Sequence, residues 1–260
     1  MIISNIKIKH LVIIILLLGA LDLFAGTIDP KVSDSKYLDY GKQHECVLPI
    51  AGILNDNLNS SFRGSCVVID EYYALTAAHI VYDSITQHII FQNKAYPCDI
   101  IAIPKHFDNK KNGLYDIALI KLSRPIKLDF YPEIYDKDDE VGKVCSIAGY
   151  GFTGNFNTGY KINTYDNKKR AGSNIIDKIE DHLLVFTANK GVRTELEFLI
   201  APGDSGGGLF IDNKIAGINS MVYAIDGNAN SSKNDSSCST RVSVFKDWII
   251  DTRKVIESIK

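Results

Sequence analysis

Three short segments carry the residue types that nucleophilic catalysis by a serine requires. Ser205 lies among glycines in the run Pro-Gly-Asp-Ser-Gly-Gly at 202–207, His79 ends the run Thr-Ala-Ala-His, and Asp116 opens the apolar run Asp-Ile-Ala-Leu-Ile. A serine hydroxyl is a weak nucleophile unless a neighbouring base takes its proton, and that base works best when a third group fixes its tautomer. The three segments therefore offer a nucleophile, a base and a carboxylate to orient the base.

Each of these residues also has a plainer explanation when it is taken alone. A single histidine after a strand is more often a hydrogen-bonded structural residue, and an aspartate before an apolar run is often a turn or cap residue. Ser205 gives the stronger signal, because its glycine neighbours allow backbone conformations that are closed to other residues. The backbone N–H groups of Gly203 and Ser205 are then candidates for an oxyanion hole, in which one donor can stabilise a transition state by about 3 kcal/mol.

The order His, Asp, Ser and the surrounding motifs resemble the chymotrypsin/trypsin-like serine peptidases over about residues 45 to 255. The matching segments are 75–79, 116–119, 149–151, 203–207 and 248–249. The resemblance implies that His79 is general base and then general acid, that Asp116 orients it, and that Ser205 is the nucleophile. A peptidase of this kind needs neither cofactor nor metal.

The same resemblance implies a strand edge and a specificity pocket that bind substrate. Their residues are Leu199, Ile200, Ser220, Met221, Val222 and Ser237. The stretch 220–222 matches the segment that pairs with the substrate backbone by β-addition, and Ser220 matches the family serine near the buried aspartate. The pocket base, at 199–200, lacks the acidic residue that binds Lys or Arg, so an apolar or small residue is expected before the scissile bond.

The chain departs from the family at the activation motif. An Ile-Val-Gly-Gly-like new N-terminus is absent, and the corresponding stretch 40–47 reads Tyr-Gly-Lys-Gln-His-Glu-Cys-Val. In zymogens of the family the freed amine pairs with the aspartate before the nucleophile, which is Asp204 in this sequence. A buried, unpaired carboxylate is costly, so Asp204 needs another partner or a solvated position.

Cysteine usage leaves two possibilities open. The five cysteines are Cys46, Cys66, Cys98, Cys145 and Cys238. In an exported chain they permit two disulfides and one free thiol, while their apolar surroundings favour buried thiols as the alternative. The disulfide that usually flanks the catalytic histidine is absent, because Gly64 takes the partner position. Such losses are common in bacterial members, so the chain is identified as a bacterial-looking member of the family.

Short β-like runs separated by turn residues dominate the chain from residue 46 onward. About twelve such runs predict an all-β fold of two six-stranded antiparallel β-barrels, chymotrypsin-like, with a C-terminal α-helix. We expect a signal peptide over 1–25, an extended lead-in over 26–44, a first β-barrel over 45–130 and a second over 131–260. The first barrel would carry His79 and Asp116, and the second would carry Ser205.

Three further segments have recognisable patterns. Residues 124–139 would connect the barrels, and the polar stretches 151–169 and 226–237 are predicted to be loops. The terminal helix would place Trp248, Val255 and Ile259 on one face and dock on the second barrel.

Composition narrows the partners and the compartment. The chain has 260 residues and a net charge of −2, so it has no general attraction for nucleic acid or anionic membranes. A basic start followed by the apolar run 11–21 predicts export, with cleavage after Ala25 or Gly26 and an uncleaved anchor as the alternative. We therefore expect a secreted or periplasmic, monomeric endopeptidase that acts on protein or peptide substrates. The alternative is a catalytically silent serine-protease homologue that acts as a secreted binding module.

Overall fold

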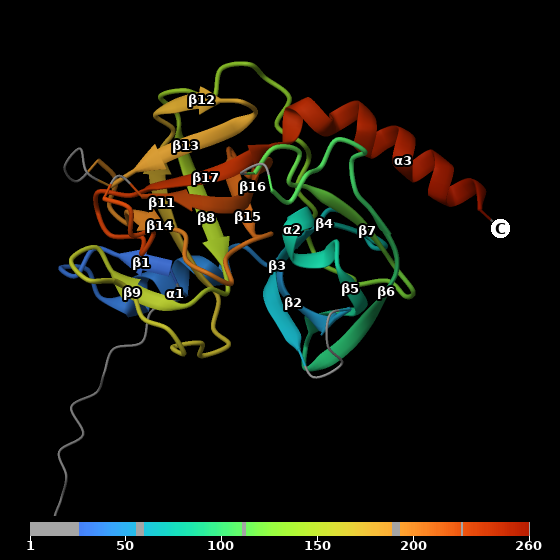
Figure 1. The fold of residues 1–260 in the computed structure, drawn as a ribbon, viewed down its shortest axis with the longest axis horizontal. Helices are drawn as coiled ribbons and strands as arrows, with labels where there is room; N and C mark the ends of the chain where they lie inside the picture. The colour runs from blue at the N-terminus through green and yellow to red at the C-terminus, as the bar shows by residue number, and fades with distance from the viewer. Residues whose placement is uncertain (1–25, 56–59, 111–112, 189–192, 225, 260) are drawn as a thin grey trace, which may run out of the picture.

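Two β-rich units lie side by side, and a C-terminal helix extends along the outside of the first (Figure 1). The computed structural model describes residues 26–55, 60–110, 113–188, 193–224 and 226–259. The expected signal peptide, at 1–25, lies outside the described residues. Within the described part of the chain, no helix is long and apolar enough to cross a bilayer.

The first unit is a closed barrel with the strand order β2-β3-β4-β7-β6-β5. Its strands are β2 (Val47–Leu54), β3 (Ser61–Val68), β4 (Tyr73–Thr76), β5 (Ser84–Phe91), β6 (Lys94–Ala102) and β7 (Ala118–Leu122). The one-turn helix α2 (Ala78–Val81) follows β4. Successive side chains of a strand point to opposite faces, and β4 is buried on both. Ala74 faces the barrel interior, whereas Tyr73 and Leu75 belong to the core outside it.

The second unit is a curled sheet with the order β11-β8-β15-β16-β17-β13-β12. Its strands are β8 (Val144–Gly149), β11 (Arg170–Ile175), β12 (Lys178–Glu180), β13 (Leu183–Thr187), β15 (Gly208–Ile211), β16 (Lys214–Tyr223) and β17 (Ser236–Arg241). The sheet has seven strands, and its two edge strands, as described, do not pair with each other. The all-β fold with a C-terminal helix is thus confirmed, with a half-barrel in place of a second closed, six-stranded barrel.

A small sheet with the order β10-β9-β1-β14 lies against the second unit. Its strands are β1 (Gly26–Ile28), β9 (Thr153–Asn155), β10 (Gly159–Tyr160) and β14 (Phe198–Leu199). Strand β1 runs parallel to β9 and antiparallel to β14. The polar stretch 151–169, predicted to be a loop, therefore contains two short strands.

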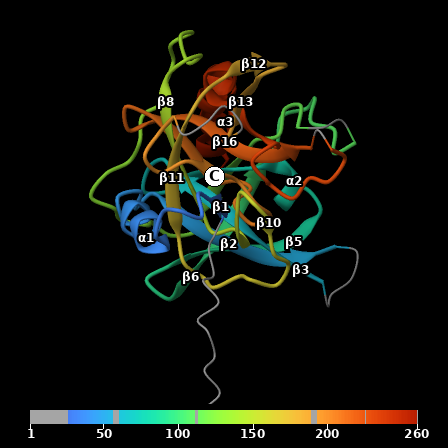
Figure 2. The same ribbon diagram turned by 90° about the vertical axis from the view of Figure 1, so that its left-hand side faces the viewer.

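The prediction of an extended lead-in over 26–44 is wrong. This segment forms β1 and then the nine-residue helix α1 (Asp34–Lys42), which lies beside β11 (Figures 1 and 2). The helix forms because the second unit offers partners to its polar residues. The hydroxyl of the fully buried Tyr37 donates to Glu197 O at 3.2 Å, and Asp34 pairs with Arg170.

Arg170 is fully buried and anchors this N-terminal segment. Its Nε donates to Asp34 Oδ1 at 2.6 Å, and its Nη2 donates to Asp34 Oδ2 and Asp166 Oδ2, both at 2.9 Å. An Arg170→Met substitution would leave two mostly buried carboxylates without this cation. We expect the free energy of unfolding to fall by about 3 kcal/mol or more.

The matched control for Arg170→Met is Lys36→Met, which removes a solvent-exposed ion pair to Glu195 from the same segment. Exposed pairs contribute about 0–1 kcal/mol, so the control should remain close to wild type in urea unfolding. Equal losses in the two variants would contradict an anchoring role for Arg170.

The predicted terminal helix is confirmed as α3 (Lys246–Ser258), which follows the 3₁₀ turn η1 (Val242–Phe245). Its expected docking is wrong. Ile249 and Ile256 are buried against the outside of the first barrel, whereas Val255 and Ile259 are 61% and 64% exposed. Arg253 pairs with Asp70 beside β4. The buried face of α3 contains Ile249 and Ile256, whereas the predicted face contains Trp248, Val255 and Ile259. The helix turns this face inward because β4 and β7 have an apolar outer surface.

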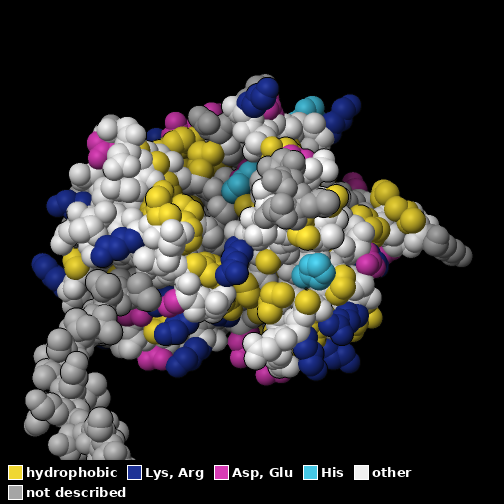
Figure 3. Space-filling model, turned by 60° about the horizontal axis from the view of Figure 1, so that its bottom comes forward, with side chains coloured by type: hydrophobic (Ala, Val, Ile, Leu, Met, Phe, Trp, Pro, Cys, Tyr) yellow, Lys and Arg dark blue, Asp and Glu magenta, His cyan; other side chains and the backbone are white. Residues whose placement is uncertain are grey.

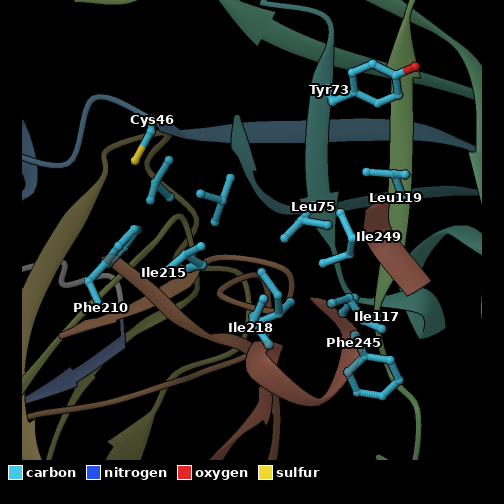
Figure 4. Close-up of a cluster of buried hydrophobic side chains, with 14 of the residues drawn as sticks. Cys46, Tyr73, Leu75, Ile117, Leu119, Phe210, Ile215, Ile218, Phe245 and Ile249 are labelled. Carbon is cyan, nitrogen blue, oxygen red and sulfur yellow. The ribbon is translucent and has the colours of Figure 1, made fainter. Parts of the chain in front are cut away.

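One hydrophobic cluster joins the two units and fixes their relative position. Leu75 and Leu119 of the first barrel share it with Phe210 and Ile218 of the second unit (Figure 4). As expected, residues 124–139 run between the units, with only an isolated bridge at Ile134 within the described residues. Because His79 and Asp116 lie in the first unit and Ser205 lies in the second, this shared core sets the spacing of the predicted site residues.

All five cysteines are free thiols, so the structure contains none of the disulfides that the sequence permits. Cys46, Cys66, Cys145 and Cys238 are buried, and each belongs to a different hydrophobic cluster. Burial raises the pKa of Cys46 and of Cys145 to about 12. These thiols act as small apolar core residues, which was the alternative interpretation.

Candidate active site

Strand pairing in the first barrel brings His79 and Asp116 together. Thr76, at the end of β4, pairs with Ala118, at the start of β7. His79 lies three residues beyond Thr76 in α2, and Asp116 lies two residues before Ala118. The register therefore places the base and the carboxylate at the same end of the barrel.

Two hydrogen bonds join these residues. His79 Nδ1 lies 2.7 Å from Asp116 Oδ2, and the backbone N–H of His79 donates to Asp116 Oδ1 at 2.8 Å. The carboxylate is only 2% exposed. It orients the ring with the proton on Nδ1, which leaves Nε2 free to accept a proton.

Residues of the second unit complete the surroundings of Asp116. The Ser220 hydroxyl donates to Asp116 Oδ2 at 2.5 Å, and the Thr240 hydroxyl donates to Asp116 O at 2.9 Å. Burial alone would raise the pKa of Asp116, but the hydrogen bonds from His79 and Ser220 hold it below its ordinary value. Asp116 is thus an ionised, fully hydrogen-bonded partner for the imidazole.

Ser205 lies in a turn that both units hold. Ser65 donates its N–H to Ser205 O at 2.8 Å and its hydroxyl to Gly203 O at 2.9 Å. Gly206 has φ +83°, and a Cβ there would lie 2.1 Å from Ser65 O and 2.2 Å from Thr76 Oγ1. This turn therefore requires glycine at position 206.

The Ser205 hydroxyl faces the strand edge of β16. It donates to Ser220 O at 3.5 Å, and no hydrogen bond joins it to His79 in the part of the chain that the structure describes. Catalytic hydrogen bonds are often long or misaligned in unliganded enzymes and tighten when substrate binds. A hydrogen bond from Ser205 Oγ to His79 Nε2 would require the Ser205 side chain to turn away from Ser220 O.

The amides of Gly203 and Ser205 have no acceptor among the described residues. Gly203 has φ +98°, and both residues are half-buried. Neighbouring amides of the turn are used differently, since Gly206 N donates to Asn219 O and Gly207 N donates to Asp204 O. The two unengaged donors are those expected for an oxyanion hole.

Asp204 is fully buried, and two backbone amides contact its carboxylate. Gly151 N–H donates to Oδ1 at 2.7 Å and Ala201 N–H to Oδ2 at 2.9 Å. A Cβ at Gly149 or Gly151 would lie 2.4 Å from a carboxylate oxygen, so the close approach depends on glycine. Burial raises the pKa of Asp204 to about 7, although these two amides and the more distant Arg170 act to lower it.

The raised pKa of Asp204 predicts a pH dependence of stability. The folded protein binds this proton more tightly than the unfolded chain, so the contribution is full below the unfolded pKa of 3.8 and is lost as the pH rises through about 7. We expect this loss to be about 4 kcal/mol between those limits.

Urea unfolding between pH 4 and pH 8 measures this effect when wild type is compared with Asp204→Asn, which cannot ionise. The wild-type free energy of unfolding should decline relative to the variant across that range. A difference that stays constant with pH would contradict a protonated carboxyl in the folded protein at low pH.

Three of the residues predicted to line the specificity pocket are closed to solvent. Leu199, Ile200 and Ser237 are buried, at 0%, 2% and 0% exposure. Leu199 pairs with Thr27 of β1, and the Ser237 hydroxyl accepts the Ile200 N–H at 3.0 Å. Strand β1, which was not expected from the sequence, covers Leu199 on β14.

The other predicted substrate-binding residues lie at the site itself. Ser220 borders a hollow of about 250 Å³ next to His79, together with Met221. Val222 follows on β16 and is half-buried. Sequence reasoning missed Thr240, Ser65 and the two amides that hold Asp204, because no local pattern distinguishes them.

Metal-binding side chains do not gather at this site. No group of three or more His, Cys, Asp or Glu residues arranged to hold a metal ion occurs within the described ranges.

Comparisons with known proteins agree with this geometry. Residues 53–249 match the trypsin family. Trypsin eta of Drosophila melanogaster is 25% identical over 216 residues, which cover 75% of this chain and 79% of that protein. The description of the chain as bacterial-looking gains no support, since this relative comes from an insect.

Solved structures show the same fold. Neuropsin, a serine protease expressed in the limbic system of mouse brain, has a TM-score of 0.64 at 17% identity, over 82% of this chain and 96% of that one. HL collagenase has a TM-score of 0.67 at 17% identity, over 89% of this chain and 98% of that one. With the family match covering three quarters of its length, the chain belongs to the trypsin family.

Proposed function

We propose that the protein is a serine endopeptidase that hydrolyses peptide bonds through an acyl-enzyme on Ser205. The observation that carries this proposal is the 2.7 Å contact between His79 Nδ1 and the buried Asp116, which leaves Nε2 as a base. Nε2 takes the Ser205 proton while Oγ attacks the scissile carbonyl. The resulting oxyanion accepts hydrogen bonds from the backbone N–H groups of Gly203 and Ser205. The imidazolium then protonates the leaving amine. A water molecule, activated by the same base, releases the acyl group and regenerates the serine.

Substrate recognition is proposed at the edge of β16. The stretch 220–222 would pair with the residues before the scissile bond by β-addition. Leu199 and Ile200, at the expected pocket base, are apolar and buried. Glu197, the acidic residue nearest to them in the sequence, is buried with its Oε1 4.0 Å from Arg193 Nε. We therefore propose cleavage after apolar or small residues. A peptide-library profile dominated by Lys or Arg would overturn this preference.

A catalytically silent binding module is the second candidate. It is favoured by the Ser205 hydroxyl, which faces Ser220 O and not His79. The two candidates differ in turnover, since a silent module would bind peptides at the β16 edge without cleaving them.

Pre-steady-state kinetics with an activated ester separate these candidates. An active enzyme should release about one equivalent of leaving group per protein in a burst, followed by slower turnover. A folded protein without a burst, which still binds substrate-like peptides, would support the silent module.

We also propose that the protein is exported and acts as a monomer. The basic and apolar start of the sequence supports export. Sequencing the N-terminus of the mature protein tests this, with Gly26 or Thr27 expected as the first residue.

A further inference from the structure

We infer that Arg63 selects peptides with an acidic residue at the second position after the scissile bond. This inference rests on the proposed peptidase function and names a substrate preference on the leaving-group side of the same site. It follows from the position of β3, from its free edge and from the surroundings of the Arg63 side chain.

Two hollows are bordered by residues next to Ser205, one by Ser220, whose carbonyl accepts a hydrogen bond from the Ser205 hydroxyl, and the other by Gly203 of the same turn. One, of about 250 Å³, is bordered by His79 and the β16 residues Ser220 and Met221, where the acyl half of a substrate would pair. The other, which we call the Arg63 cleft, is about 450 Å³ and runs from Gly203 of the oxyanion turn to Arg63 on β3. A peptide that places its carbonyl on the Gly203 amide thus leaves through the Arg63 cleft.

Strand β3 presents a free backbone edge along this cleft. It pairs with β2 over its whole length, but with β4 only at Val67 and Val68. Ser65 lies opposite Pro49, which has no backbone N–H to donate. The N–H of Ser65 itself donates to Ser205 O, away from β2. Residues two apart on a strand point their backbone groups the same way, so those of Arg63 also face away from β2.

The spacing fits the first residues of a leaving peptide. Arg63 precedes Ser65 by two residues, which is about 7 Å along a strand. An extended peptide covers the same distance between its scissile bond and the second residue beyond it. Backbone pairing with the free edge would therefore bring that residue next to the Arg63 side chain.

The Arg63 side chain is oriented but has no carboxylate partner. Its guanidinium lies 5.0 Å from the centre of the Tyr165 ring, which also lines the cleft. Arg170, Arg193, Arg241 and Arg253 each lie against a carboxylate, whereas Arg63 has no such partner among the described residues. The cation–π contact orients the planar guanidinium and leaves the N–H groups at its edge available to donate hydrogen bonds to a carboxylate.

Charge in the cleft is local. Asp and Glu are absent from the cleft lining that the structure describes, and Arg63 is its only charged residue. On the surface shown in Figure 3, basic side chains form small separate groups among acidic and uncharged ones. A preference for acidic residues would therefore come from Arg63 itself and not from a general positive field.

The test uses two peptides that differ only at the second residue after the scissile bond, Glu in one and Lys in the other. Wild type should cleave the Glu peptide with kcat/KM about tenfold or more above the Lys peptide, as expected for one charge-assisted contact. Arg63→Ala should bring the two values together, and Arg63→Glu should reverse the order. Arg124→Glu, which makes the same charge change at an exposed arginine over Tyr96, should keep the wild-type preference.

A p-nitroanilide substrate, which has no residue after the scissile bond, separates this inference from the proposed function. All of these variants should hydrolyse it at the wild-type rate. Cleavage of the anilide with no preference between the peptides would overturn the role of Arg63, as would a similar loss of preference in Arg124→Glu. Failure of wild type to cleave either peptide or the anilide would instead overturn the peptidase function.

Discussion

Replacing Ser205 with alanine is expected to lower kcat for peptide hydrolysis by about a million-fold, to the level that binding and the oxyanion donors alone can supply. The substitution removes the hydroxyl of the turn that carries the unengaged amides of Gly203 and Ser205. It should leave the fold intact, because the turn is held through the backbone of Ser205 and through Gly203 O, which Ser65 contacts.

Matched binding and unfolding measurements make the Ser205→Ala result specific. The variant should bind a peptide inhibitor that lacks a reactive group with wild-type affinity and unfold at the wild-type urea midpoint. Ser243, a half-buried serine in η1 away from the site, offers a control, since Ser243→Ala should retain full activity. Substantial peptide hydrolysis by purified Ser205→Ala would place the nucleophile elsewhere.

Asp116→Asn is expected to lower kcat by about ten-thousand-fold while preserving the shape of the site. An amide at this position can still accept the backbone N–H of His79. Its NH₂ group, however, would face Nδ1, so the ring would carry its proton on Nε2, where it could not accept one from Ser205. The loss should appear in kcat with little change in KM.

Thr240→Val is the matched comparison for Asp116→Asn. It removes the hydroxyl that donates to Asp116 O and leaves both carboxylate oxygens in place. A loss of less than about tenfold is expected, since the tautomer of His79 does not depend on this bond. If Asp116→Asn retained near wild-type kcat, the carboxylate would not orient the base.

Local patterns were enough to predict most of the fold. The apolar runs 73–76, 183–187 and 208–211 predict strands, and they coincide with β4, β13 and β15. The site residues could be named because His79, Asp116 and Ser205 lie in short distinctive motifs. Their convergence in space depends on the β4–β7 register and the shared core, which local patterns do not encode.

Long-range contacts explain the remaining differences. Strand β1 has only three residues and exists because β9 and β14 lie on either side of it. The helix α1 depends on Arg170, which is buried and pairs with Asp34. From the sequence alone, a charged residue such as Arg170 is expected on the surface. The docking face of α3 depends on the outer surface of β4, and the burial of Leu199 depends on β1.

The partner of Asp204 could not be predicted for the same reason. The sequence lacks the family's activation motif, and the structure instead provides the amides of Gly151 and Ala201. Gly149 and Gly151 allow this approach, and both lie in the segment 149–151 that resembles the family. The sequence does not indicate their role, which depends on their contact with the Asp204 carboxylate in the folded protein.

Covalent labelling with a fluorophosphonate tests the proposed chemistry most directly. The folded wild-type protein should gain one adduct, located by mass spectrometry on Ser205, and His79→Ala should label far more slowly at an unchanged urea midpoint. Absence of labelling in folded wild type, or an adduct on another residue, would contradict Ser205 as a nucleophile activated by His79 and Asp116.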